Sequence, residues 1–268
     1  KTMDKKIGFI GCGNMAQAMI SALVKSKLIE SNQVIASNRS KNILEKMNKE
    51  YGITIASNNI EVAEKCDIVF LAVKPNLYEM VMKEIKDSVT KDKIFVSIAP
   101  GKTMEFLEAH LGEDAKILRT MPNTPSMVSE GMTAICPNSN IDSEELELLI
   151  KLIESFGAVE LIEEKLFDAV VAVSGSSPAY VFMFIEAMAD AAVIQGMPRA
   201  QAYRFAAQAV LGSAKMVLES KSHPGELKDM VCSPGGTTIE AVAVLEERGM
   251  RSAVIEAMRK CGQKSKGM

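Results

Sequence analysis

The chain has 268 residues, of which 47% are hydrophobic and 24% charged, and its formal net charge is −3. This composition is typical of a soluble globular protein, and the slightly acidic balance argues against a nucleic-acid or anionic-membrane partner. No apolar run reaches the roughly 18–20 residues that span a membrane, and no signal peptide is recognised, so we expect a cytoplasmic protein. The five cysteines form no CxxC pair and neither histidine lies near a second ligand type, which favours reduced thiols and predicts no metal site.

The first predicted strand, Lys6–Ile10, ends at a glycine turn. The turn reads G-x-G-x-x-A from Gly11 to Ala16, and a helical pattern follows it. Strand, glycine turn and helix together are the context in which this motif binds a dinucleotide. Gly11 permits the tight turn, Gly13 lets the pyrophosphate approach, and Ala16 lets helix and strand pack closely. The motif alone is weak, so the prediction of a dinucleotide site rests on its flanks.

The second predicted strand, Val34–Ala36, is followed by the sequence Ser-Asn-Arg-Ser over residues 37–40. A site for NAD usually has an acidic residue here, which accepts hydrogen bonds from the ribose hydroxyls. Neutral donors and the guanidinium of Arg39 suit a 2′-phosphate instead. We therefore predict a preference for NADPH, with NADH as a possible second cofactor; the alternative is an ordinary solvated loop with one arginine.

Short apolar runs continue the alternation of strands and helices through the first half of the chain. They predict strands over residues 53–55, 67–73, 94–98, 117–120, 132–136 and 160–162. The run Asp67–Val73 is almost continuously apolar, as in a parallel strand buried on both faces. We predict an α/β fold, with a Rossmann-type, doubly wound sheet over residues 1–162 and an all-helical domain over residues 163–268.

The second half of the chain carries only helical patterns. Helices are predicted over residues 165–173, 178–194, 198–218, 227–231, 238–247 and 251–260, with an interruption at residues 174–177 where Ser177 caps the next helix. The segment Tyr180–Val193 is apolar nearly all round and must be buried on every side. The helical residues of one chain are too few to surround this segment alone. We therefore predict a homodimer whose subunits enclose it jointly through this domain.

The stretch from Asp229 to Glu240 contains a Ser-Pro-Gly-Gly-Thr-Thr loop that leads into a helix. Thr237 and Glu240 have the spacing of a capping box. Glycines beside the first amides let a ligand approach the backbone, and a helix N-terminus favours an anion. If Thr237 is the cap, the hydroxyl of Thr238 is free to face that ligand; the alternative is a well-capped surface helix after a turn.

Taken together, these motifs resemble the pyrroline-5-carboxylate reductase family over essentially the whole length. The most specific part runs from Leu227 through the Ser-Pro-Gly-Gly-Thr-Thr loop to Glu246. Four further motifs support it in the right order: residues 8–16, Ala72–Pro75, Met121–Pro125 and Ser174–Tyr180. The resemblance implies NAD(P)H-dependent reduction of the cyclic imine Δ1-pyrroline-5-carboxylate to L-proline. It also implies an interleaved dimer through the helical domain, which in some members assembles further into decamers.

The resemblance also implies which residues form the site. The loop matching Ser233–Thr238 holds the substrate, Thr238 hydrogen-bonds the ring nitrogen, and Glu164 lies near the substrate. We therefore predict Thr238 as the catalytic residue and Glu164, Ser233, Gly236, Thr237 and Thr238 as the substrate-binding residues. The predicted cofactor-binding residues are Ile10, Gly11, Cys12, Gly13, Asn14, Met15, Asn38, Arg39, Asn59, Ala72, Val73, Lys74, Pro75, Ile98 and Ala99.

Two rivals remain open from the residues themselves. The β-hydroxyacid dehydrogenases resemble the chain in the first glycine motif, but they use a lysine on the helix that follows a glycine-rich turn. Here the turn at residues 174–177 is followed by no lysine until Lys215, which disfavours that class. A non-catalytic NADPH-binding regulator is the second rival, and it would bind the cofactor without turnover.

Overall fold

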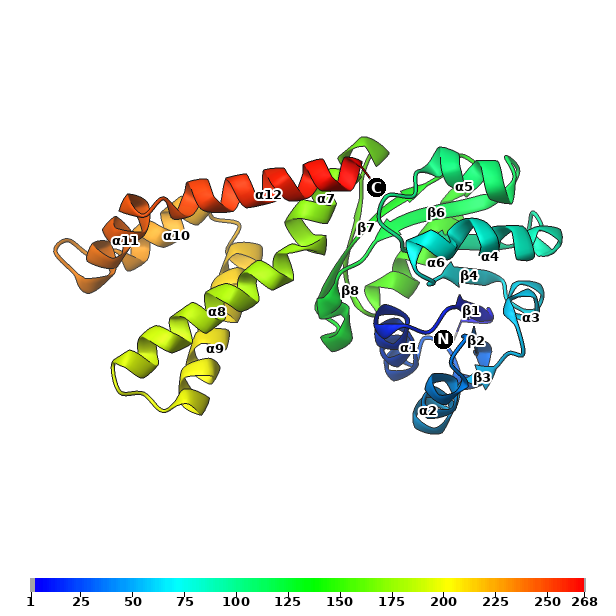
Figure 1. Cartoon of the computed structure of the whole chain (residues 1–268), viewed down its shortest axis with the longest axis horizontal. Helices are drawn as coiled ribbons and strands as arrows, with labels where there is room; N and C mark the ends of the chain where they lie inside the picture. The colour runs from blue at the N-terminus through cyan, green and yellow to red at the C-terminus, as the bar shows by residue number, and fades with distance from the viewer. Residues whose placement is uncertain (1–2, 268) are drawn as a thin grey trace. The chain divides into compact units, whose positions relative to one another are not determined.

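The computed structural model describes residues 3–267 and divides the chain into two compact units (Figure 1). One unit contains the chain up to Ser176 together with the C-terminal residues from Cys261, and the other is Ser177–Lys260. The predicted domain boundary after residue 162 divides the chain by strand content. The boundary between the two compact units lies later in the sequence, after Ser176, because the first helical turns after the sheet pack against the unit that contains the sheet.

A single sheet forms the centre of the first unit. Its strands are β1 (Ile7–Ile10), β2 (Val34–Ser37), β3 (Thr54–Ile55), β4 (Ile68–Leu71), β5 (Ile94–Ser97), β6 (Lys116–Met121), β7 (Gly131–Pro137) and β8 (Gly157–Leu161). Their order is β3-β2-β1-β4-β5-β6-β7-β8, and the pairs from β3 to β6 are parallel. The order reverses between β1 and β4, where ligands gather in such sheets. The predicted α/β fold is confirmed.

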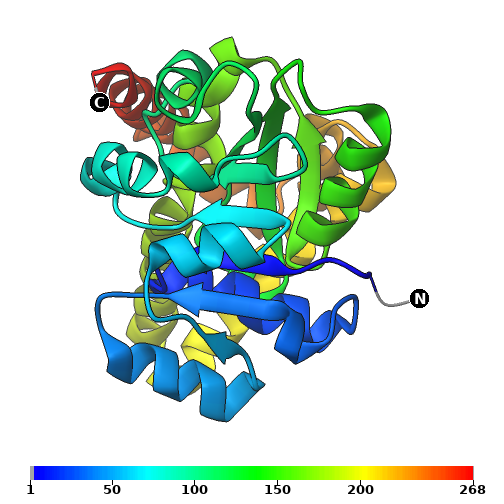
Figure 2. The same ribbon diagram turned by 90° about the vertical axis from the view of Figure 1, so that its right-hand side faces the viewer.

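Helices cover both faces of this sheet (Figure 2). Alternate side chains of β1, β2, β4, β5 and β6 enter two separate cores. On one face lie α1 (Asn14–Ser26), α2 (Lys41–Tyr51) and α6 (Ser143–Glu154). On the other lie α3 (Asn59–Lys65), α4 (Tyr78–Glu84) and α5 (Met104–Leu111). Phe9 and Phe70 stack across β1 and β4 with ring centroids 4.8 Å apart. Burial on both faces explains the continuous apolar runs of these strands.

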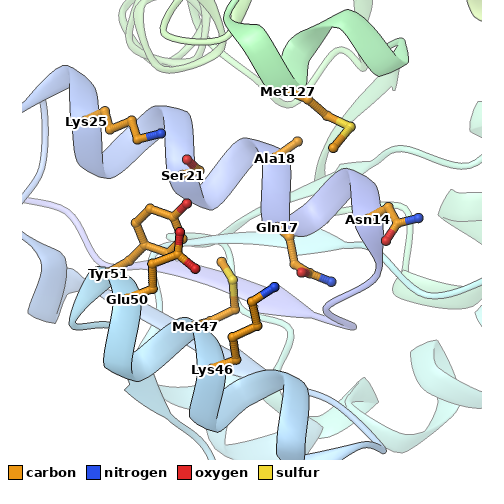
Figure 3. Close-up of a pocket in the computed structure, with 10 residues that line it drawn as sticks. All are labelled: Asn14, Gln17, Ala18, Ser21, Lys25, Lys46, Met47, Glu50, Tyr51 and Met127. Carbon is orange, nitrogen blue, oxygen red and sulfur yellow. The ribbon is translucent and has the colours of Figure 1, made fainter.

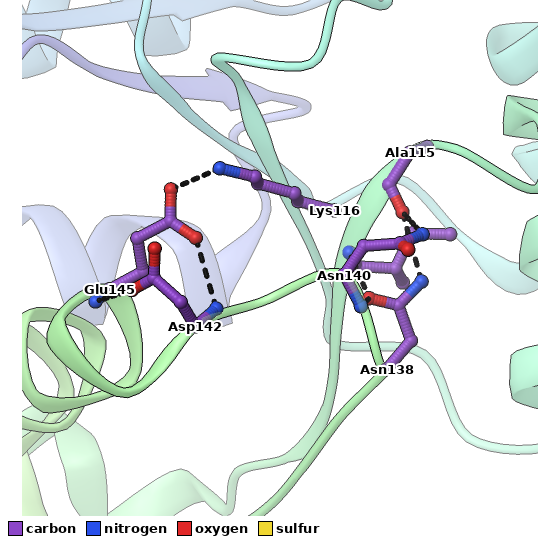
Figure 4. A network of polar contacts seen from close by, with 7 residues as sticks. Ala115, Lys116, Asn138, Asn140, Asp142 and Glu145 are labelled. Atoms are coloured by element: carbon purple, nitrogen blue, oxygen red, sulfur yellow. Dashed lines mark hydrogen bonds and ion pairs between the residues drawn. The ribbon is translucent and has the colours of Figure 1, made fainter.

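Strand β7 runs antiparallel to β6, which the sequence analysis did not anticipate. Residues 122–130 connect the two strands, and this stretch is shorter than the roughly dozen residues that a parallel crossover needs. Asn138, at the end of β7, accepts from the amide of Ile117 and donates to the carbonyl of Ala115 (Figure 4). Lys116 pairs with Glu145, whose carboxylate also caps the start of α6. These contacts fix the hairpin and the helix that follows it.

The α-helix is interrupted over residues 171–176, where the sequence predicted a break at residues 174–177. The short helix α7 (Phe167–Val170) passes into a π-helical segment, Val171–Gly175, and then into α8 (Ser177–Ile194). The amide of Ser176 donates to the carbonyl of Val171, and the side chain of Asn123 donates to the carbonyl of Ser174. A Cβ on Gly175 would lie 2.7 Å from Cε of Met121, so the wide turn passes close to the end of β6. The predicted interruption is therefore present, as a π-helical segment and a bend at Ser176, but Ser177 is the first residue of α8 and not a cap that precedes it.

The second unit is helical throughout, as predicted. It contains α8, α9 (Arg199–Ser220), α10 (Pro224–Val231), α11 (Thr237–Glu247) and α12 (Met250–Lys266) up to Lys260. The C-terminal end of α12 belongs to the first unit, where Ser265 donates to the carboxylate of Asp168 at 2.6 Å.

One helical stretch, Glu164–Ile194, is long and apolar enough to cross a membrane by length and composition alone. The expectation that no segment of the chain reaches this length was therefore too strong. Only 6% of its most apolar window is buried within the chain. Exposed apolar side chains on it include Phe182 and Met183, which are 60% and 67% exposed.

Candidate active site

The turn after β1 approaches the end of β4 so closely that only glycine fits. Gly11 has φ +96°, and a Cβ at this position would lie 2.7 Å from the backbone of Ala72. Gly13 has no atom within 4 Å of its would-be Cβ, so its face is open to space. The first glycine therefore serves the fold, and the second leaves the amides at the start of α1 accessible to a ligand.

The side chain of Asn38 holds this turn from β2. Its Oδ1 accepts from the amide of Cys12 at 3.1 Å, and its Nδ2 donates to the carbonyl of Ser40 at 3.2 Å. Gln17 donates to the carbonyl of Cys12 at 3.0 Å. Burial raises the pKa of the Cys12 thiol to about 11, so this side chain stays neutral near pH 7 and adds no negative charge beside the turn.

A groove of about 750 Å³ lies at the carboxyl ends of β1, β2 and β4. The predicted cofactor residues that line it are Gly11, Cys12, Gly13, Asn38, Arg39, Asn59, Ala72, Val73 and Lys74. Ile10 and Ala99 are buried in the core instead. Asn14, Met15, Pro75 and Ile98 lie outside the groove lining, and their contact with a cofactor stays a prediction.

Seven residues of the groove were missed by the sequence analysis. They are Ser37, Ser57, Asn58, Leu77, Met80, Val81 and Glu84. The last four come from α4 and the turn before it, at spacings of three and four residues that place them on one side of a helix. This spacing, directly after a predicted strand end, was the available signal.

Arg39 is exposed at the edge of the groove. Among the ion pairs of residues 3–267, none involves its guanidinium. Its charge is therefore available to an anionic group of a ligand. Glu84 also lines this groove, and it accepts from the side-chain amide of Asn59 at 2.8 Å.

A second, smaller hollow of about 230 Å³ lies between α1 and α2 (Figure 3). Lys25 lies over the ring of Tyr51 at its rim, 5.8 Å from the centroid, and Met127 approaches from the turn after β6. Asn14 lines this hollow, but Gly11 and Gly13 do not. The glycine turn therefore marks the larger groove as the candidate cofactor site.

Glu164 takes part in a partly buried ion pair within the first unit. Its Oε1 accepts from Nη1 of Arg119 and from the amide of Met104, each at 2.6 Å. The side chain of Arg119 is only 7% exposed, and its guanidinium lies 4.3 Å from the ring centroid of Phe167. These contacts account for Glu164 structurally, so its predicted role at the substrate stays a prediction.

The late glycine loop belongs to the second unit. Gly236 is the N-cap of α11 and has no side-chain cap, and Thr237 is the first helical residue. The predicted capping box with Thr237 as the cap was therefore wrong, because the chain turns one residue earlier. Gly235 has φ +67°, and a Cβ on Gly236 would lie 2.4 Å from Oγ of Ser233. A helix start without a side-chain cap leaves its first amides to solvent or to an anionic ligand.

Comparison with known proteins identifies both halves of the chain. Residues 164–268 match a family model described as pyrroline-5-carboxylate reductase dimerisation, and residues 6–101 match one described as NADP oxidoreductase, coenzyme F420-dependent. Pyrroline-5-carboxylate reductase from Escherichia coli (strain K12) is 56% identical, with 98% of each chain covered.

The chain belongs to the pyrroline-5-carboxylate reductase family.

More distant reductases agree with this assignment. The Methanosarcina acetivorans protein is 40% identical, with 98% of this chain and 97% of the other covered. The solved structure of pyrroline carboxylate reductase from Plasmodium falciparum, with NADP bound, has a TM-score of 0.91 at 33% identity and covers 100% of this chain and 99% of the other. The resemblance read from the motifs is confirmed.

The two glycines of the first turn should differ in their effect on stability. Gly11→Ala is expected to lower the free energy of unfolding by about 2–4 kcal/mol, because the added Cβ meets the Ala72 backbone at a positive φ. Gly13→Ala is the matched control and should stay within about 1 kcal/mol of the wild type. Urea unfolding, monitored by circular dichroism, measures the free energy of unfolding of both variants. Equal losses of stability would contradict the assignment of Gly11 to the fold and of Gly13 to ligand access.

Removing the charge of Glu164 should destabilise the fold. Glu164→Gln is expected to cost about 1–3 kcal/mol, less than a fully buried pair, because the Glu164 side chain is 37% exposed while Arg119 stays buried. Glu163→Gln is the control: its partner Lys165 is 73% exposed, so the change should stay within about 0.5 kcal/mol. If both variants melt like the wild type, the ion pair does not support the fold.

Proposed function

We propose that this chain catalyses the NAD(P)H-dependent reduction of Δ1-pyrroline-5-carboxylate to L-proline, the last step of proline biosynthesis. The observation that carries the proposal is the 56% identity to the E. coli reductase over 98% of both chains. The groove beside the glycine turn supports it independently, because it supplies the dinucleotide site that such a reductase needs.

The residues of the groove fit a dinucleotide. The open face of Gly13 and the start of α1 suit a pyrophosphate, and the groove volume of about 750 Å³ suits an extended ligand. When bound, the cofactor supplies the hydride from its nicotinamide ring. The chain's own residues orient the two partners in near-attack geometry, which can supply about 7–11 kcal/mol of the barrier.

NADPH is the preferred form of the cofactor in this proposal. Arg39 is exposed at the groove and engaged in no ion pair of the described chain, so it is available to a 2′-phosphate. Asn38, by contrast, has both ends of its amide engaged: its Oδ1 accepts from the amide of Cys12 in the glycine turn, and its Nδ2 donates to the carbonyl of Ser40. We assign charge recognition to Arg39 and the support of the turn to Asn38.

The late loop holds the substrate in this proposal. The amide of Gly236 donates to the carbonyl of Ser233 at 3.0 Å and closes the loop. Ser233 and the amide of Thr237 bind the carboxylate, helped by the helix dipole, which is worth roughly 0.3–1 kcal/mol at an exposed site. These contacts position the ring rather than drive the reaction. Thr238 donates a hydrogen bond to the ring nitrogen or orients a protonated iminium. Since a threonine hydroxyl is a poor acid near neutral pH, we favour the orienting role. The proton on the ring nitrogen then comes from water or is already carried by the substrate.

Glu164 contributes less directly. Its carboxylate already accepts from Arg119 and from the first amide of α5, so it cannot turn freely toward a ligand. We therefore assign it to the support of the site rather than to the reaction.

A homodimer through the helical domain, residues 163–268, is the proposed functional unit, and decamers of such dimers are the proposed larger assembly. Helices α8 and α9 leave large apolar side chains open within one chain: Phe182, Met183, Phe205, Leu211 and Leu218 are each 55% exposed or more. An apolar hollow of about 480 Å³, lined by Val242, Leu245, Met250, Val254 and Ile255 among others, lies in the same unit. A patch of this kind marks a protein interface. A second chain that covers α8 also explains its membrane-like composition without a membrane, in keeping with the proposed cytoplasmic location.

The direct test is the oxidation of NADPH followed at 340 nm after pyrroline-5-carboxylate is added to the purified protein. The proposal expects turnover that depends on both the protein and the imine, with L-proline as the product. Cofactor binding without turnover would favour the non-catalytic regulator instead.

Replacing Thr238 should slow turnover. Thr238→Ala is expected to lower kcat by roughly 10–1000-fold if its hydrogen bond strengthens in the transition state. Thr238→Ser keeps the hydroxyl and should retain most of the activity, which separates a lost hydrogen bond from lost packing. Unchanged kcat and KM in Thr238→Ala would remove the residue from the mechanism.

Replacing Arg39 should change the choice of cofactor. Arg39→Asp is expected to lower the ratio of kcat/KM for NADPH over NADH by about tenfold or more, because it replaces an attractive charge at the 2′-phosphate with a repulsive one. Lys49→Asp makes the same charge change at the exposed far end of α2 and should leave the ratio unaltered. A constant ratio in Arg39→Asp would show that another group reads the 2′-phosphate.

The helical domain should hold the protein as a dimer, or as a multiple of it, at micromolar concentration in analytical ultracentrifugation. Met183→Asp and Phe205→Asp should weaken the assembly without unfolding the chain, because both side chains are 67% exposed within one chain. Lys46→Asp, on α2, is the control for added negative charge. A monomeric wild type would refute the proposed interface.

A further inference from the structure

The part of the cofactor groove that α4 contributes changes from apolar to acidic along the helix. Leu77, Met80 and Val81 present aliphatic and thioether surface, and Glu84 follows one turn later. The four residues lie on one side of the helix and line the same groove as Asn38 and Arg39. Such a wall suits a flat ring with apolar faces and a hydrogen-bond donor at one edge.

The carboxylate of Glu84 is held in place by a chain of hydrogen bonds. Oγ of Ser37 donates to Oδ1 of Asn59 at 2.8 Å, and Nδ2 of Asn59 donates to Oε2 of Glu84 at 2.8 Å. Both ends of the Asn59 amide are thereby engaged, which fixes its orientation. Within residues 3–267, the second oxygen of Glu84, Oε1, has no hydrogen bond or ion pair recorded for it, so it retains its capacity to accept from a ligand.

We propose that Glu84 is a specificity-determining residue that accepts a hydrogen bond from the exocyclic amino group of adenine. Adenine has two apolar faces and an amino group at its edge, and a carboxylate accepts hydrogen bonds but donates none. A hypoxanthine ring presents a carbonyl oxygen at the same position, which a carboxylate repels. Glu84 thus selects the adenine dinucleotide over its deaminated analogue. This inference rests on the proposed use of NADPH in this groove.

Direct binding measurements test the inference without relying on catalysis. The ligands are NADPH and its hypoxanthine analogue, deamino-NADPH, and the readout is the Kd from nicotinamide fluorescence or calorimetry with the full-length protein. The variants are Glu84→Ala, Glu84→Gln and, as the control, Glu79→Gln, which removes the same charge from an exposed position of α4 outside the groove lining.

The wild type and Glu79→Gln should bind NADPH about tenfold more tightly than deamino-NADPH. Glu84→Ala should bind the two within about twofold of each other, mainly because its affinity for NADPH falls. In Glu84→Gln the side-chain oxygen keeps accepting from Asn59, so the amide nitrogen faces the ligand and donates; the preference should be lost or reversed, with deamino-NADPH bound at least as tightly as NADPH. Thermal melts confirm that each variant is folded.

Two results would overturn the inference. One is a wild type that binds both ligands equally; the other is a Glu84→Ala variant that keeps the full preference for NADPH. A wild type that binds neither ligand would instead overturn the assignment of the groove as the cofactor site. If the wild type binds NADPH, that assignment holds, and a failure then concerns the role of Glu84 alone.

Discussion

The contact between the first glycine turn and the end of β4 is the constraint on which the rest of the sheet unit depends. Gly11 fits within van der Waals distance of the Ala72 backbone because it has no Cβ, and its positive φ directs the chain into α1. The ends of β1, β2 and β4 therefore lie side by side, and the groove opens above them. Asn38 then secures the turn from the neighbouring strand.

The helical unit follows from a different constraint, the large apolar surface of α8 and α9. A helix that is apolar nearly all round cannot be satisfied by the few helices of its own chain, and side chains such as Met183 and Phe205 stay exposed there. In the proposed homodimer, a second copy covers this surface and removes apolar area from water, which is the usual source of stability in a permanent dimer. Strands β1, β2, β4, β5 and β6 need no such partner, because helices of the same chain cover both of their faces.

The sequence predicted the elements that depend on local pattern and missed those that depend on distant contacts. The buried strands were recognisable because both faces are covered, so their residues are uniformly apolar. The π-helical segment Val171–Gly175 was not, because it depends on Asn123 and Met121, which lie far from it in sequence. Side-chain preference favours Thr237 as the cap of α11, whereas the backbone turns at Gly236. The antiparallel β7 could have been inferred from its short connection to β6.

The groove shows why a motif identifies a site more readily than it identifies the atoms that meet a ligand. Asn38 and Asn59 were predicted to contact the cofactor, yet each has its amide engaged by the protein at both ends. A side chain that is engaged in this way acts on a ligand by fixing its neighbours: Asn38 fixes the glycine turn, and Asn59 fixes Glu84. The groups left to the ligand are those with spare capacity, among them the guanidinium of Arg39, the second oxygen of Glu84 and the open backbone beside Gly13. Selectivity is therefore expected to reside in Arg39 and Glu84, which no glycine motif encodes, and the motif itself supplies only the opening through which a dinucleotide can approach.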